Sequence, residues 1–74
     1  VTLQSVFKAA ILSSASAIIV MHNHPSSDCY PSKEDKTLTE KIKELGITLG
    51  YPLLDHIIVS SDGDTFSFAD AGLM

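Results

Sequence analysis

The sequence predicts a single α/β domain whose elements follow the order α-β-α-β-β. Three observations predict this fold class: an amphipathic segment at the start, two short runs of β-branched residues, and a capped helix between those runs. A chain of 74 residues forms at most one small domain. Residues 1–74 are therefore expected to form one α/β domain.

The first helix and the first strand follow from two apolar patterns. Residues 3–14 are expected to be helical, because Leu3, Phe7 and Ile11 recur one turn apart. Residues 17–21 (AIIVM) form a continuous apolar run, which is typical of a strand buried on both faces. Such a strand belongs inside a sheet, so a further strand should pair beside it, either from a missing N-terminal segment or from a second copy in a homodimer.

Ser32 opens the clearest helix of the sequence. Ser32-x-x-Asp35 is close to a capping box, and acidic side chains in the first turn suit the helix dipole. Gly50 suits a C-cap, and Pro52 prevents the helix from continuing. The apolar positions between these ends are spaced by four, three and four residues, as expected for one buried face (Leu38, Ile42, Leu45 and Leu49).

The rest of the chain predicts two further strands. Residues 53–60 form a second apolar strand, and residues 65–68 return as a third. Residues 61–64 (SDGD) between them predict a tight turn, with Gly63 at a position of positive φ. The tail, residues 69–74, is expected to form one helical turn.

Composition argues against some classes of function. All five basic residues are lysines, and nine acidic residues outnumber them, giving a net charge of -4. Specific duplex recognition depends on arginine forks and a basic surface, so direct nucleic-acid binding is not expected. The longest apolar run is too short to cross a bilayer. A single cysteine excludes an intrachain disulfide and fits a reducing compartment, so a cytoplasmic location is predicted.

A metal site is predicted where the first strand ends. Side chains two residues apart on a strand share a face, so His22 and His24 should converge while Asn23 points away. Asp35 lies in the first turn of a helix whose start must return to that edge of the sheet. Two imidazoles and a carboxylate are good Zn²⁺ ligands, and three protein ligands leave a position for water. Zinc there could activate water for attack on a carbonyl.

The same residues resemble a known family. The pattern His22-x-His24, seven residues, Ser32-x-x-Asp35 resembles the HxH-x7-S-x2-D motif of the JAMM (MPN-plus) metalloproteases. More narrowly, HNHPSSDCYPSKED is similar to the RadC-type branch of JAB domains, and so are AIIVMHNHP, LGITLGYPLLDHIIV and FSFADAGLM. The likeness covers nearly the whole chain, which would then be the C-terminal portion of such a domain. It implies a cytidine-deaminase-like three-layer sandwich.

The resemblance also implies roles for individual residues. His22, His24 and Asp35 would bind zinc. Ser32 would be catalytic, by holding the oxyanion or the water at zinc. The reaction implied is hydrolysis of a peptide or isopeptide bond.

Two departures from the family pattern stand out. The family's general base is a glutamate well upstream of the HxH, but residues 1–21 contain no Glu or Asp. Glu34 neighbours the motif, yet it fits better as surface charge on its helix. The chain is therefore expected to be a fragment or a shortened paralogue, inactive alone. Cys29 replaces a usual loop residue and could be a fourth ligand that closes a structural zinc site.

Two alternative functions remain open from the sequence. One is a non-catalytic metal-binding or interaction module associated with DNA repair. Another is a metal-dependent nuclease, although HNH nucleases hold their histidines in a ββα-metal hairpin, unlike the strand and capped helix expected here. Finally, His56 after Asp55 is interpreted as a hydrogen-bonded structural histidine in preference to a ligand or a support for one.

Overall fold

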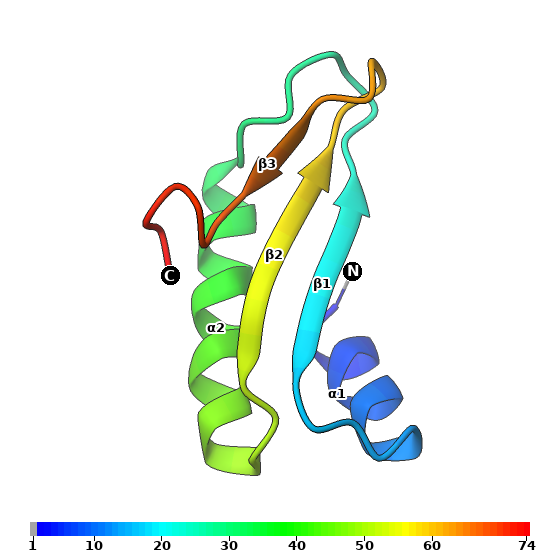
Figure 1. The fold of residues 1–74 in the computed structure, drawn as a ribbon, viewed down its shortest axis with the longest axis vertical. Coiled ribbons are helices and arrows are strands. Elements are labelled where there is room, and N and C mark those ends of the chain that lie inside the picture. Colours follow the sequence, from blue (N-terminus) through cyan, green and yellow to red (C-terminus); the bar gives the residue numbers. More distant parts are fainter. Residues whose placement is uncertain (1) are drawn as a thin grey trace.

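The computed structural model describes residues 2–74 and confirms the α-β-α-β-β order (Figure 1). No helix within these residues is long and apolar enough to cross a membrane. The elements are α1 (Leu3–Leu12), β1 (Ile18–Asn23), α2 (Lys33–Leu49), β2 (Leu53–Val59) and β3 (Thr65–Ser67).

The three strands form one mixed sheet in the order β1-β2-β3. β1 pairs with β2 in parallel, with His22 opposite Ile58, and β2 pairs with β3 in the antiparallel direction. The carboxyl ends of β1 and β2 therefore lie at the same edge, where the chain leaves β1 and loops over to the start of α2 (Figure 1). This edge is where the candidate site forms.

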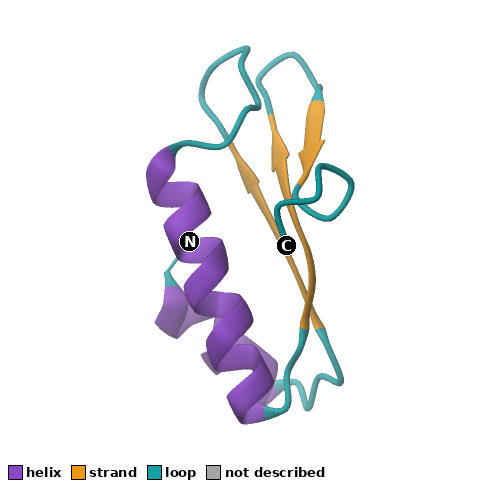
Figure 2. Ribbon diagram, turned by 90° about the vertical axis from the view of Figure 1, so that its left-hand side faces the viewer, coloured by secondary structure: helices purple, strands orange, loops and turns teal. Residues whose placement is uncertain are grey.

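Both helices lie on the same face of the sheet (Figure 2). The buried side chains between the layers come from both helices and the two longer strands (Phe7, Ala10, Ile18, Val20, Ile42 and Leu53). Leu49 in the last turn of α2 and Ile11 near the end of α1 are exposed, so the predicted apolar stripes are buried over only part of each helix. Residues 2–74 thus form two layers of an α/β fold.

Within residues 2–74, β1 has a free edge and an uncovered outer face, and the further strand that the sequence predicts beside it is not among these residues. β2 is the middle strand, and β1 is an edge strand. Ile19 and Met21 point to the outer face and are 60% and 62% exposed. A continuous apolar run does not reveal which face is covered, and here both helices cover the inner one. A groove along the free edge of β1, lined also by Val6 and Ala9 of α1, remains open.

Local signals set the ends of α2 as predicted. Ser32 is the N-cap, and it forms a capping box with Asp35. Gly50 ends the helix at φ 81°, a left-handed conformation that costs glycine little. α1 ends at Leu12, two residues earlier than expected. The tail forms a single α-turn, in which Ala71 N–H donates to Ser67 C=O, so the one helical turn predicted near residues 69–74 is present but begins two residues earlier.

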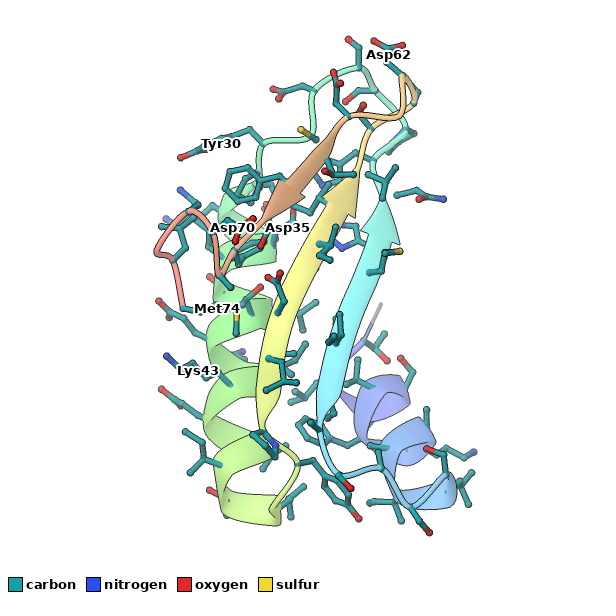
Figure 3. The ribbon with its side chains drawn as sticks, in the orientation of Figure 1. Tyr30, Asp35, Lys43, Asp62, Asp70 and Met74 are labelled. Atoms are coloured by element: carbon teal, nitrogen blue, oxygen red, sulfur yellow. The ribbon has the colours of Figure 1, made fainter. Side chains whose placement is uncertain are left out.

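Gly46 gives a test of how tightly α2 packs on the chain that follows it. A Cβ at Gly46 would meet the carbonyl oxygen of Tyr51 at less than contact distance, because the backbone N–H of Tyr51 bonds back to the Gly46 carbonyl at 2.8 Å. Overpacking costs about 1–3 kcal/mol, offset by roughly 1 kcal/mol of helix propensity. Gly46→Ala should therefore lower the free energy of unfolding in urea by up to about 2 kcal/mol. Lys43→Ala, on the exposed face (Figure 3), should change it by less than about 0.5 kcal/mol.

Candidate metal centre

His22 and His24 reach the same side of the sheet from the end of β1. Asn23 between them is exposed, as the alternation of a strand requires. The backbone N–H of His24 donates to the carbonyl of Val59 at 2.9 Å, which extends the pairing with β2 one residue beyond the strand. The two imidazole centroids are 5.1 Å apart.

Asp35 meets them from the first turn of α2. The backbone N–H of Ser32 donates to Asp35 Oδ2 at 2.9 Å, and the backbone N–H of Asp35 donates to Ser32 Oγ at 3.1 Å. This capping box fixes the carboxylate at the start of the helix, near the carboxyl edge of the sheet (Figure 3). The capping motif of α2 therefore also orients the Asp35 carboxylate toward the two histidines.

The three side chains converge on one point. His24 Nε2 lies 2.8 Å from Asp35 Oδ2, and His22 Nε2 lies 3.4 Å from Asp35 Oδ1. One ligand atom from each residue lies within 4.8 Å of the others. Each side chain is 16–18% exposed, so the cluster is sheltered but reachable. The predicted trio of His22, His24 and Asp35 is thus brought together.

Hydrogen bonding and burial act on the protonation of the cluster. Burial lowers the pKa of His22, the charge of Asp35 opposes this, and His24 adds to the lowering. Partial burial raises the pKa of Asp35, but hydrogen bonds from Ser32 and His24 together outweigh it and leave this pKa below its usual value. A neutral imidazole and an ionised carboxylate are the forms that bind a metal. The site therefore holds His22 and Asp35 in the forms that metal binding requires.

The donor set fits a transition metal better than Mg²⁺ or Ca²⁺. Imidazole nitrogen suits zinc and its neighbours, whereas the hard cations prefer oxygen alone. Among residues 2–74, Cys29 is not part of the converging group, so the structure does not bring together the closed four-residue site considered above. Ser32 touches the group through Asp35 and is itself exposed.

Comparison with known proteins identifies the family. The family model described as RadC-like JAB domain matches residues 1–73. The chain belongs to the RadC-like JAB domain family. Its relatives include a UPF0758 protein of Thermotoga maritima, 52% identical over 69 residues that make up 93% of this chain. A UPF0758 protein of Geotalea uraniireducens is 48% identical over 71 residues, or 96% of the chain. The chain spans 31% of the length of each of these curated relatives.

This RadC-like JAB domain holds a further histidine beside the cluster. His56 on β2 is completely buried, and its Nε2 lies 2.7 Å from His22 Nδ1. Its Nδ1 faces the hydroxyl of Thr39 on α2. Burial first, and then the charge of His22, lower the pKa of His56 to about 4. His56 is therefore buried and hydrogen-bonded as predicted, and one of its partners is the candidate ligand His22.

Sequence reasoning missed this contact and the part played by Thr39. Thr39 looks like an ordinary helical residue, and it is 2% exposed. One signal was available: a histidine inside an apolar strand must find a hydrogen-bond partner once it is buried. The pattern does not say which partner.

Proposed function

We propose that this RadC-like JAB domain is the zinc-binding part of a JAMM-type metallohydrolase that acts on peptide or isopeptide bonds. The observation that carries the proposal is the convergence of His22, His24 and Asp35 at the carboxyl end of β1. The spacing of these residues, which resembles the JAMM motif, and the family membership support it.

The side chains have separate tasks in this proposal. When bound, zinc supplies Lewis-acid activation of water and of a substrate carbonyl. His22, His24 and Asp35 would hold it, and three protein ligands leave a position open. Ser32 Oγ already accepts the backbone N–H of Asp35. Within residues 2–74 the Ser32 hydroxyl acts as an acceptor and its hydrogen remains available, so it can donate to the oxyanion of a substrate carbonyl.

Proton transfer is not assigned to a residue of this chain. The motif it resembles uses a glutamate upstream of the histidines, and residues 1–21 contain neither Glu nor Asp. We therefore expect residues 1–74 to bind zinc and to hydrolyse peptides slowly or not at all. The test is to incubate a peptide library with the zinc-loaded chain. Zinc-dependent cleavage at a substantial rate would contradict this expectation.

We also propose the cytidine-deaminase-like three-layer sandwich as the complete fold. The exposed apolar side chains of Ile19 and Met21 on the outer face of the sheet support it, because a third layer would bury them. The free edge of β1 supports pairing with a further strand or a second copy.

Zinc binding itself is the first test. The wild-type chain, equilibrated with excess zinc and then freed of unbound ion, should retain about one zinc per chain. His24→Ala removes a ligand, so its zinc affinity should fall by at least about 100-fold, more than the loss of a supporting residue costs. Competition with a chromophoric chelator measures both affinities.

Asn23→Ala is the matched control. Asn23 lies between the two histidines but points to solvent, so this variant should bind zinc as the wild type does. A wild type without bound zinc would contradict the proposal. Equal affinities for wild type and His24→Ala would contradict it as well.

A further inference from the structure

We propose that Thr39 and His56 are positioning residues that fix the tautomer of His22, so that its Nε2 faces the metal site with a free lone pair. The inference rests on the proposed function and extends it beyond the three ligands. It starts from a row of three buried or partly buried hydrogen bonds that links β1, β2 and α2.

The geometry around His22 assigns a task to each ring nitrogen. Nε2 faces the cluster, 3.4 Å from Asp35 Oδ1, and Nδ1 lies 2.7 Å from His56 Nε2. A neutral imidazole carries one proton, on one of its two nitrogens. Metal binding at Nε2 therefore requires the proton on Nδ1, from which it donates to His56 Nε2.

The hydrogen bond from Thr39 to the Asp35 carbonyl determines which group donates in each of the other hydrogen bonds of this row. A backbone carbonyl can only accept, so the Thr39 hydroxyl, 2.8 Å from the carbonyl oxygen of Asp35, donates to that oxygen. Thr39 Oγ1 is then the acceptor for His56 Nδ1–H at 2.5 Å. With its proton on Nδ1, His56 accepts at Nε2, which is what the metal-binding tautomer of His22 requires.

Burial keeps water away from Thr39 and His56. His56 is completely buried, and Thr39 is 2% exposed. Phe68 stacks on the His56 ring with centroids 4.7 Å apart and planes 10° from parallel, which holds the ring in place. Thr39 lies one turn after Asp35 on α2, so the hydrogen bonds connect two candidate ligands through the interior.

Removal of the Thr39 hydroxyl should reverse the hydrogen bond between His22 and His56, so that His56 becomes the donor. His56 Nδ1–H would then be buried without an acceptor, and the favourable alternative moves its proton to Nε2. His22 Nδ1 would become an acceptor, and the proton of His22 would lie on Nε2, where the metal must bind. Zinc binding would have to reverse this arrangement, so affinity should fall.

The variant that tests this is Thr39→Val, which keeps the shape and removes the hydroxyl. Its zinc dissociation constant, measured by chelator competition, should rise about 10–100-fold, as for other residues that support metal ligands. Thr39→Ser keeps the hydroxyl and should bind zinc like the wild type. Thr37→Val is the second control, because the exposed Thr37 hydroxyl makes the same type of bond, to the Lys33 carbonyl, without touching a histidine.

A second measurement needs no zinc. Histidine ¹⁵N spectra of the zinc-free protein, at a mildly alkaline pH where the rings are neutral, report which nitrogen carries each proton. The proton of His22 should lie on Nδ1 in the wild type and move to Nε2 in Thr39→Val. A wild-type His22 protonated on Nε2 would overturn the inference, as would unchanged affinity in Thr39→Val. If the wild type failed to bind zinc, the proposed function would fall, while these spectra would still decide the tautomer.

Discussion

Zinc at about 1,000 times its dissociation constant should raise the midpoint of thermal unfolding by roughly 15–30 °C. A ligand at that excess stabilises the folded state by about 4 kcal/mol, and each kcal/mol shifts the midpoint of a domain this small by about 4–8 °C. Zinc stabilises only the folded state because the unfolded chain lacks the site: His22 and His24 lie at the end of β1, and folding alone brings Asp35 of α2 to them. Calorimetry with and without added zinc measures the shift.

Three controls separate a specific site from general ion effects. EDTA should return the midpoint to that of the zinc-free chain. Mg²⁺ at the same concentration should leave the midpoint unchanged. Two imidazoles and one carboxylate suit zinc, whereas Mg²⁺ prefers oxygen ligands alone. His24→Ala should show no shift with zinc. A shift of equal size in His24→Ala would mean that zinc binds elsewhere.

Local sequence signals predicted α2 with little error, because each signal acts within a few residues. Ser32 and Asp35 satisfy each other's backbone N–H groups within one turn, and Gly50 adopts the left-handed conformation that ends a helix. The metal trio was predictable for the same reason. His22 and His24 share a face through strand geometry alone, and the start of α2 must return to the strand it follows.

The support of the site could not be predicted, because it depends on strand register. His56 lies 34 residues from His22 along the chain, and only the parallel pairing of Val20 with His56 brings the rings to 4.8 Å. A sequence pattern fixes the face of a strand, but not which residue of another strand lies opposite. The exposure of the outer face of β1 could not be predicted either, because Ile19 and Met21 are apolar whether or not their face is covered.

In the zinc-free protein, the free energy of unfolding should fall by roughly 3 kcal/mol as pH decreases from 6.5 to about 4. His56 carries this effect. Burial lowers its pKa from 6.5 to about 4, so between these values the unfolded chain binds a proton that the folded chain does not. Stability from this group is complete above pH 6.5 and is lost toward pH 4. As the pH falls below the usual pKa of an aspartate, stability decreases further. Asp35 and Asp55 have lowered pKa values in the fold, so the unfolded chain takes up their protons first.

Urea unfolding in EDTA at a series of pH values measures this dependence, and His56→Gln is the variant that isolates it. Glutamine does not titrate, so the variant should be less stable at neutral pH but show a much shallower slope between pH 6.5 and 4. The lowered pKa of His22 leaves a residual slope of the same sign in both proteins. Equal slopes in wild type and His56→Gln would show that His56 does not stay neutral in the fold, and that its burial between His22 and Thr39 is not maintained in solution.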